Sequence, residues 1–232
     1  SEDDLSNVSV LTQMQEMGRA KFDVSEDLTS ETKDRFQQAG QIAMHIVGGT
    51  SRLTDAMAAS LRGAVLTGKR VVSVDMTSTK ASVRCADGSE YKADFVIATL
   101  PFVALRKVKI TPEMQGPQGE AVATMSYTGQ SQVWLRVKEP YWEHDGVEAS
   151  MWSDSSISVV RQLIGYDGNR EKASVLTTGP KADFLDRMPP KERGEYVLAE
   201  LARIRPSTQG KLEVLGCFSW KLDPYSMACR HT

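Results

Sequence analysis

The most informative segment of this chain for its fold is Ile46-Val47-Gly48-Gly49, which continues as Thr50–Leu61. A short apolar run over 43–47 stops at the glycine pair, and Thr50 is placed to cap a helix. The apolar side chains that recur on one face of that helix are Leu53, Met57 and Leu61. This order predicts a strand, a glycine turn and a helix.

A β-rich region follows the helix. It contains two expected strands, Arg70–Asp75 and Lys80–Ala86, and then Asp87-Gly88, a strong hairpin signal before the expected strand Glu90–Val96. The last run, Val96–Leu100, is continuously apolar, which predicts a strand that is buried on both faces.

The second half of the chain predicts an antiparallel sheet with a helix packed on it. Three prolines mark a linker over 101–119, where we expect a crossing between domains. The expected strands beyond it are Ser131–Val137, Ser156–Ile164, Ala173–Thr178 and Leu212–Trp220. The helix expected on this sheet is 190–204, and two further helices, 6–17 and 31–39, are expected before the glycine pair. This mixture predicts a mixed α/β fold, of the α+β kind, with at least two sheets.

The composition argues against several classes of partner. The 232 residues carry 28 basic and 30 acidic side chains without a run of five like charges, so neither nucleic acid nor an anionic membrane surface is expected. No apolar run approaches the roughly 20 residues that cross a bilayer. Cys85, Cys217 and Cys229 stand far apart, so we expect neither a disulfide framework nor a zinc site, and a reducing, cytoplasmic compartment.

Several short segments occur in an order that resembles the flavin-containing amine oxidases, a family of monoamine and L-amino-acid oxidases. The two most specific are Lys138-Glu139-Pro140-Tyr141-Trp142 and Trp220 followed by Asp223-Pro224-Tyr225-Ser226. The others are the Gly48-Gly49 turn, Val71, the Asp87-Gly88 hairpin, Ala93-Asp94-Phe95-Val96-Ile97 and Pro190-Lys191-Glu192-Arg193. Together these segments extend over nearly the whole chain.

The resemblance implies part of a two-domain FAD-dependent amine oxidase fold. Residues 1–46 and 120–219 would form the substrate domain, a mixed antiparallel sheet flanked by helices. Residues 47–119 would form the centre of the FAD-binding domain, and 220–232 would return toward it. The family's N-terminal glycine-rich turn and its final flavin segment have no counterpart in this sequence. We therefore expect an incomplete FAD-binding domain, weak FAD binding and no turnover by residues 1–232 alone.

The resemblance also indicates cofactor-binding positions. Gly48 and Gly49 leave backbone N–H groups open at a helix start, although such a pair more commonly only permits a tight turn. The chain has no GxGxxG motif, so it carries no independent dinucleotide-binding unit. Val71 matches a position whose backbone contacts the adenine end of FAD in relatives.

Three further cofactor positions lie near the end of the chain. Trp220 and Tyr225 match aromatic residues close to the flavin. Cys229 falls where some members attach FAD through a cysteine sulfur. Most members lack this link, and a lone cysteine is more often a small buried hydrophobe, so both interpretations of Cys229 stay open.

The catalytic candidate is Gln132. Relatives transfer a hydride equivalent from the carbon beside the amine nitrogen to the flavin, which oxygen usually reoxidises. Many of them place a lysine near the flavin, and counting back from Lys138 the matching residue is Gln132. Its amide can hold a water, as that lysine does, but brings no charge. The alternative is an ordinary inward polar residue in a shifted alignment.

Two arginines are candidate substrate-binding residues. Arg161 lies in the apolar run Ile157–Leu163, and its planar guanidinium suits a carboxylate. Alternatively, Arg161 faces solvent or pairs with a nearby acid. Arg230 occupies the place of an aromatic residue that walls the amine in many relatives, and an arginine there would suit an anionic group. Together they favour an amino-acid-like substrate over a simple amine.

Three functions stay open at this point. The first is an FAD-dependent oxidase that takes a small-molecule amine or amino acid, with oxygen as the acceptor. The second is a related flavin desaturase acting on C–C bonds, favoured by Gln132 and Arg230. The third is a non-catalytic domain that kept the substrate-domain fold. The three histidines show no metal-ligand spacing, so no metal is expected, and a homodimer stays open as the oligomeric state.

Overall fold

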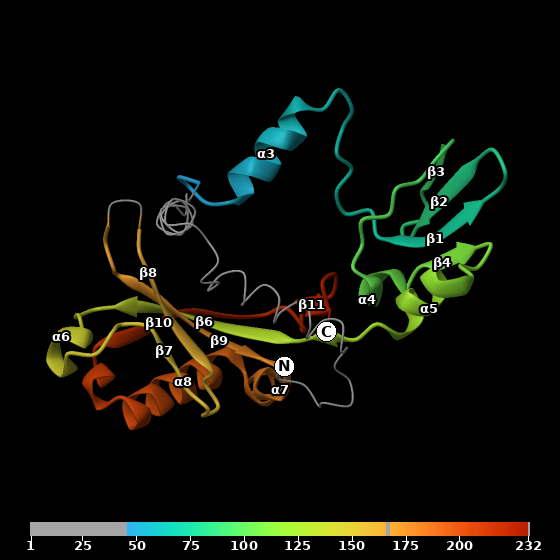
Figure 1. Ribbon diagram of the computed structural model, residues 1–232. Helices are drawn as coiled ribbons and strands as arrows, with labels where there is room; N and C mark the ends of the chain where they lie inside the picture. The colour runs from blue at the N-terminus through green and yellow to red at the C-terminus, as the bar shows by residue number, and fades with distance from the viewer. Residues whose placement is uncertain (1–45, 166–167, 232) are drawn as a thin grey trace, which may run out of the picture.

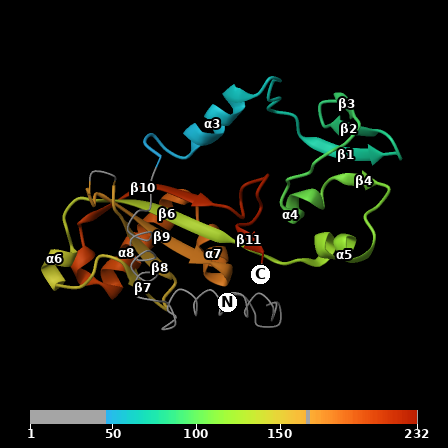
Figure 2. The same cartoon turned by 45° about the horizontal axis from the view of Figure 1, so that its top comes forward.

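The computed structural model describes residues 46–165 and 168–231. Within them the chain forms two sheet units at opposite ends of the molecule, as both Figure 1 and Figure 2 show. Their assignment to a substrate domain and an FAD-binding domain stays a prediction. The helices expected over 6–17 and 31–39, and most of the strand expected over 43–47, lie outside the described residues. No helix of the described ranges is long and apolar enough to span a bilayer.

The first unit is a four-stranded sheet with the order β3-β2-β1-β4. Its strands are β1 (Val71–Met76), β2 (Ala81–Cys85), β3 (Glu90–Ala93) and β4 (Lys109–Thr111). The first three are antiparallel neighbours, whereas β4 pairs with β1 in parallel. The predicted hairpin is confirmed: the Asp87 carboxylate accepts hydrogen bonds from the backbone N–H and the hydroxyl of Ser89, and Gly88 has a φ of 85°.

Two predictions for the following segment are wrong. Val96–Leu100 forms no strand, and Ile97 is 89% exposed. The described strands pair in the order β3-β2-β1-β4, and none of them pairs with this apolar run. The expected linker over 101–119 contains α4 (Phe102–Leu105), β4 and the start of α5 (Gly116–Thr124). The prolines that indicated a linker lie at the ends of these short elements, where proline is tolerated.

The helix predicted after the glycine pair is confirmed as α3 (Ser51–Ser60). Thr50 is its N-cap residue but makes no side-chain cap hydrogen bond, and the two residues before the glycines are not in a strand. The expected stripe of Leu53, Met57 and Leu61 is exposed rather than buried. In Figures 1 and 2, α3 stands away from both sheets, so no described element covers this stripe.

The second unit is the predicted antiparallel sheet, with five strands in the order β10-β6-β9-β8-β7. The strands are β6 (Gln130–Val137), β7 (Met151–Trp152), β8 (Val159–Leu163), β9 (Lys172–Thr178) and β10 (Leu212–Ser219). The shorter elements are α6 (Trp142–Asp145), the 3-10 helix η2 (Pro206–Thr208) and a two-stranded ladder of β5 (Tyr127–Thr128) with β11 (Arg230–His231).

Two helices, α7 (Gly179–Asp186) and α8 (Pro190–Ile204), cover one face of this sheet (Figure 1). Alternate residues of β6, namely Val133, Leu135 and Val137, are buried in the core with them. The rest of this core is formed by Tyr141, Ile157, Val160, Ala173, Val175, Leu185, Val197, Leu201 and Leu212. The helix predicted over 190–204 is therefore confirmed, and it leaves the other face of the sheet free of described helices.

The segment that begins at Lys138 has a structural role. Tyr141 is 1% exposed, and its hydroxyl donates to the carbonyl of Ala149 at 2.6 Å. The Arg205 guanidinium lies 4.7 Å over the Tyr141 ring and donates to both carboxylate oxygens of Asp145 at 2.8 Å. This pair holds the pKa of Asp145 well below its usual range. The motif thus anchors the loop at the end of β6.

Candidate functional site

The side chains of the five-stranded sheet that point away from α7 and α8 form a surface that we call the outer face. Strand pairing shows which residues share it. In one row across the strands, Gln132 lies between Phe218 and Leu176, and the row continues through Val159 to Trp152. Because side chains alternate along a strand, all five point away from the helices.

Arg161 lies on the same outer face. It is opposite Ser174, which is opposite Trp134. The strand spacing and rise put the backbone of Arg161 roughly 12 Å from that of Gln132. Arg161 is exposed and makes no ion pair with any described residue. The register therefore brings the catalytic and substrate candidates onto one face, while their roles stay predictions.

One end of the outer face gathers three predicted residues around Gln130. Trp220 donates its backbone N–H to the Gln130 carbonyl at 2.9 Å, and the Cys229 thiol donates to Gln130 Oε1 at 2.9 Å. The Trp220 ring packs edge-on against Phe218, with 4.9 Å between centroids, beside Gln132. The Cys229 side chain is exposed rather than a buried hydrophobe. Sequence reasoning missed Gln130, whose signal is its two-residue spacing from Gln132 on one strand.

Arg230 and the glycine pair complete the predicted set. The backbone of Arg230 pairs with Thr128 in the ladder that precedes β6. Gly48 and Gly49 have φ values of 89° and 100°, which glycine adopts readily, and Arg52 closes their turn with a 2.9 Å hydrogen bond to a backbone carbonyl. Neither glycine lines either of the two pockets described next, so the structure does not bring them to the other candidates.

A pocket of about 570 Å³ brings Val71 and Tyr225 together. It lies between β1, α4 and the turn that follows β10, and the aliphatic side chains of Leu66 and Leu100 are part of its lining. Its cationic lining residues are Lys69, Arg70 and Lys107. Two cofactor candidates that are far apart in the sequence therefore share one cavity.

FAD, the cofactor that the resemblance implies, suits this pocket. FAD combines flat rings with two phosphates, and the pocket combines an aromatic ring and aliphatic side chains with cations. Lys69 pairs with Asp87 at 2.5 Å, a hydrogen bond that raises the Lys69 pKa, whereas Arg70 and Lys107 make no ion pair with a described residue. The volume falls in the range of about 300 to 1,000 Å³ that is usual for ligand sites. Val71, Tyr225 and the two unpaired cations are the residues that can hold it.

Asp223 shapes the wall of this pocket that carries Tyr225. Its carboxylate accepts hydrogen bonds from the backbone N–H groups of Ser226 (2.6 Å) and Tyr225 (3.0 Å), which lower its pKa. Met227, at the end of the turn, has a φ of 55°, a left-handed conformation that is rare outside glycine. The Asp-Pro-Tyr-Ser segment is thus an aspartate-capped turn that presents Tyr225 to the pocket.

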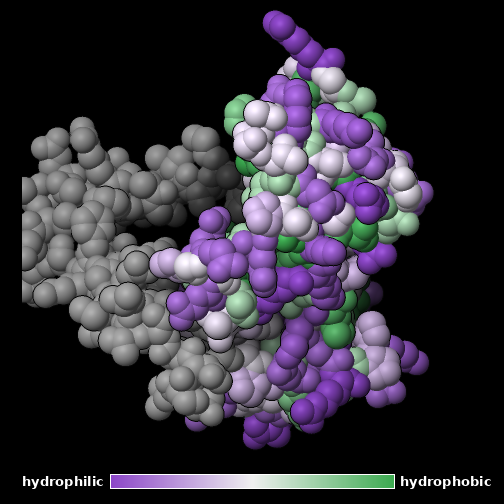
Figure 3. Space-filling view, turned by 90° about the vertical axis from the view of Figure 1, so that its right-hand side faces the viewer, coloured by the Kyte–Doolittle hydropathy of each residue, from purple (hydrophilic) through white to green (hydrophobic). Residues whose placement is uncertain are grey.

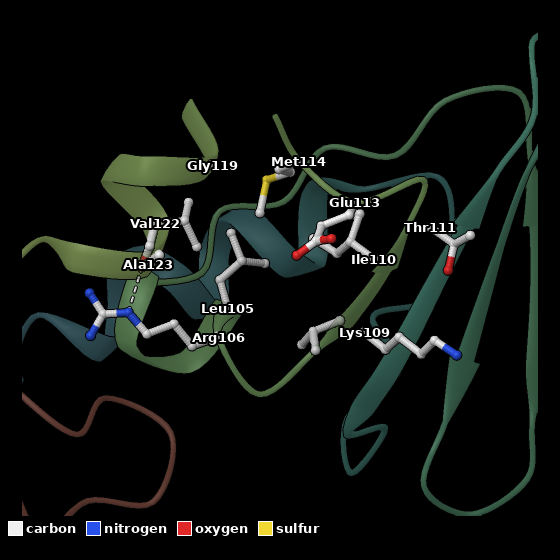
Figure 4. Close-up of a pocket in the computed structure, with 11 residues that line it drawn as sticks. Leu105, Arg106, Lys109, Ile110, Thr111, Glu113, Met114, Gly119, Val122 and Ala123 are labelled. Carbon is white, nitrogen blue, oxygen red and sulfur yellow. Dashed lines mark hydrogen bonds between the residues drawn. The ribbon is translucent and has the colours of Figure 1, made fainter. Parts of the chain in front are cut away.

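A second pocket of about 520 Å³ lies between α4, β4 and α5 and holds none of the predicted site residues (Figure 4). Leu105, Met114 and Val122 converge on it, whereas Lys109 points away along β4. Arg106 closes one end by donating to the carbonyl of Val122. Within the described residues, no group of three or more His, Cys, Asp or Glu could hold a metal ion.

Comparison with known proteins identifies the family. Residues 5–232 match the family model described as flavin containing amine oxidoreductase. A flavin-dependent L-tryptophan oxidase from Lentzea aerocolonigenes is 28% identical over 190 residues, which cover 78% of this chain and 38% of that protein. An L-amino acid oxidase from Bothriechis schlegelii is 22% identical over 192 residues, which cover 78% of this chain and 39% of that relative.

A solved structure shares the fold. The cyclohexylamine oxidase from Brevibacterium oxydans matches with a TM-score of 0.66 at 12% identity, over 78% of this chain and 40% of that one. This likeness confirms the predicted mixed α/β fold as part of an FAD-dependent amine oxidase fold. The chain spans about two fifths of the length of these relatives. The family match confirms FAD as the expected cofactor, and with residues 5–232 matched the chain belongs to the flavin-containing amine oxidoreductases.

Proposed function

We propose that this chain supplies the substrate-facing sheet of an FAD-dependent oxidase that acts on the C–N bond of an α-amino acid. The observation that carries the proposal is the register that puts Arg161 and Gln132 on one outer face. Their backbones lie roughly 12 Å apart, a gap that two long side chains and a small amino acid can span. The names of the relatives, an L-tryptophan oxidase and an L-amino acid oxidase, support the same substrate class.

Each residue has its own role in this proposal. Arg161 binds the substrate carboxylate through two parallel N–H···O bonds, which fixes the α-carbon. Gln132 both donates and accepts hydrogen bonds, so its amide orients the amine or a water beside it. Trp134 and Phe218 exclude water from the face between them. When bound, FAD supplies the acceptor for the hydride equivalent.

The proposal also covers the acceptor and the compartment. Oxygen is the electron acceptor, which the oxidase names of the relatives support. The compartment is the cytoplasm, and the three free cysteines support it because an oxidising compartment favours disulfides. Val71 and Tyr225 contribute to holding FAD through the pocket that they share.

The FAD-loaded enzyme that contains these residues tests the substrate class. Flavin reduction is followed without oxygen, with L-amino acids and with the amines that lack only the carboxylate. Arg161→Met should raise the amino-acid concentration for half-maximal reduction about 10- to 150-fold, the worth of hydrogen bonds to a charged group, and should leave the amines unchanged. Arg136→Met is the matched control, because Arg136 lies on the same face but pairs with Glu213 at 3.2 Å. Equal losses with both substrate classes, or no loss, would contradict the role of Arg161.

A second candidate function follows from Gln132. This neutral amide stands where many relatives have a lysine, and the difference favours a flavin desaturase that acts on C–C bonds. The two reactions differ in their products, because oxidation of a C–N bond followed by hydrolysis releases ammonia and desaturation releases none. Ammonia and peroxide measured together on the FAD-loaded enzyme therefore distinguish the two candidates.

A further inference from the structure

A buried ion pair lies beneath the outer face, on the core side of the sheet. Arg193 of α8 has a side chain that is 3% exposed, and the side chain of Asp186, at the end of α7, is 6% exposed. Arg193 Nη1 lies 3.1 Å from Asp186 Oδ1, at ion-pair distance but without hydrogen-bond geometry. Arg193 also donates to the carbonyls of Leu185 at 3.0 Å and Met188 at 3.3 Å. The pair therefore sits at the junction of the two helices.

Two serines connect this pair to the strands above it. Arg193 Nη1 donates to Ser131 Oγ of β6 at 3.2 Å. Ser219 of β10 donates its hydroxyl to Asp186 Oδ2 at 2.6 Å. Ser131 and Ser219 lie opposite each other in the pairing of β6 with β10. One ion pair thus holds the two neighbouring strands at the same level.

The serines are covalent neighbours of residues on the outer face. Ser131 precedes Gln132, and Ser219 lies between Phe218 and Trp220. Gln132 and Phe218 form the next pair along the same ladder. Consecutive Cα atoms are about 3.8 Å apart and rigidly linked. A shift at Ser131 therefore moves the Gln132 side chain on the opposite face of the sheet, and a shift at Ser219 moves the side chain of Phe218.

A glycine lets α8 come close enough for this arrangement. A Cβ atom on Gly194 would lie 3.0 and 3.1 Å from the two methyl groups of Val214 in β10, tighter than normal van der Waals contact. The close approach of α8 to β10 at this point allows Arg193 to reach across to β6. Gly194 therefore allows the guanidinium of Arg193 to lie beneath the sheet.

We infer that Arg193 and Asp186 are positioning residues for the substrate site, because through Ser131 and Ser219 they fix where Gln132 points on the outer face. Burying two charges costs desolvation that a hydrophobic pair avoids, so a buried ion pair is poorly explained by stability alone. The need to fix β6 and β10 relative to each other explains why the ion pair is present. The inference rests on the proposed function, in which Gln132 faces the reacting amine.

The FAD-loaded enzyme with Ser131→Ala or Ser219→Ala tests this inference, because each change removes one hydroxyl link and little volume. At a temperature where every variant is folded, the limiting rate of flavin reduction should fall about tenfold, while the half-saturating substrate concentration changes by less than about twofold. The visible flavin spectrum and the near-ultraviolet circular dichroism of the Phe218–Trp220 ring pair should change as well. Glu213→Gln is the matched control, since it breaks the exposed 3.2 Å pair with Arg136 across the same strands.

The outcomes separate positioning from simple stabilisation. A lower melting temperature with unchanged reduction rate and unchanged spectra in the serine variants would overturn the inference, and so would an equal loss of rate in Glu213→Gln. Ser219→Thr keeps the hydroxyl and should restore the rate toward that of the wild type. If the wild-type enzyme reduces its flavin with neither amino acids nor amines, the proposed function fails. The flavin spectrum and circular dichroism of the serine variants still decide the positioning role in that case.

Discussion

The two sheet units differ in how completely the described chain covers their apolar side chains. In the five-stranded unit, α7 and α8 bury Leu135 and Val197 to 0% exposure. In the segment that connects β3 to β4 of the four-stranded unit, Phe95 and Ile97 are each 89% exposed, and in α3, which precedes the unit, Leu53 is 55% exposed. Figure 3 faces the four-stranded unit and shows hydrophobic side chains lying among hydrophilic ones on its surface.

The two units therefore obtain their stability from different sources. Full burial of a large apolar side chain is worth about 1.5 to 3 kcal/mol relative to exposure. The five-stranded unit gains this from its own helices, which follow its strands closely in the sequence. The four-stranded unit and α3 leave such side chains uncovered by any described residue. The unit proposed to face the substrate therefore has a core covered by its own helices, whereas the region predicted to bind FAD buries a smaller set of apolar side chains among the described residues, including Val74, Cys85 and Leu105.

We expect the greatest loss of stability when the buried ion pair of the five-stranded unit is removed. Arg193→Met leaves Asp186 buried without its partner and should lower the free energy of unfolding by about 3 to 5 kcal/mol. Arg136→Met removes an exposed pair with Glu213 in the same sheet and should cost at most about 1 kcal/mol. Urea unfolding followed by circular dichroism measures both changes. Equal losses would mean that Arg193 is not buried with Asp186 as the structure has it.

A second prediction compares the cores of the two regions directly. Leu135→Ala removes a fully buried side chain and leaves a cavity, so it should cost about 2 to 5 kcal/mol of unfolding free energy. Ile97→Ala removes a side chain that is 89% exposed and should change that free energy by no more than about 0.5 kcal/mol. Both are measured on residues 1–232 by urea unfolding. A large loss in Ile97→Ala would show that the segment after β3 is packed after all.

A third prediction concerns the close approach of α8 to the sheet. Gly194→Ala puts a methyl group 3.0 to 3.1 Å from the Val214 methyls and should cost about 1 to 3 kcal/mol through overpacking. Gly63→Ala is the control outside the sheet, because a Cβ there meets nothing within 4 Å. Thermal unfolding monitored by circular dichroism compares the two. A neutral or stabilising Gly194→Ala would contradict the close contact between α8 and β10.

Local patterns were sufficient to predict much of this fold. The two-residue alternation of β6, the helical stripe of α8 and the Asp87-Gly88 hairpin each depend on neighbours in the sequence, and all three are confirmed. The strand expected at Val96–Leu100 is different, because a strand buried on both faces needs partner strands at its edges and covering elements on its faces, which come from elsewhere in the chain. The apolar run alone could not show that no described strand pairs with it.

The candidate site depended on contacts that no local pattern contains. The sequence indicated Gln132 and Arg161 separately, and only the order β6-β9-β8 shows that they share one face. Val71 and Tyr225 likewise meet only through the folded chain. The sequence indicated Arg193 only as part of Pro190-Lys191-Glu192-Arg193, a segment at the start of a helix that resembles the family. The neighbouring Gly194 is the one local signal that this helix turn lies close to the sheet.

A fourth prediction, for which we expect a modest change, compares the acid sensitivity of the two units. Arg205 holds the pKa of Asp145 well below its usual range in the five-stranded unit, and Lys69 does the same for Asp87 in the four-stranded unit. Because the folded-state pKa is depressed, this stabilisation is present above the unfolded aspartate pKa of about 3.9 and is lost as the pH falls below it toward the folded value. Asp145→Asn should therefore lower the melting temperature at neutral pH and flatten its decline between about pH 4 and pH 2.

The control for that prediction is Asp55→Asn in α3, since Asp55 makes no ion pair with a described residue. Its melting temperature should follow the wild-type decline over the same pH range. If the melting temperature of Asp145→Asn declines as steeply as that of the wild type, protonation of Asp145 and loss of its pair with Arg205 are not the cause of the wild-type decline. If Asp87→Asn flattens the decline more than Asp145→Asn does, acid unfolding begins in the four-stranded unit. That result would mean that the four-stranded unit, in which the described residues leave large apolar side chains uncovered, is the less stable of the two units.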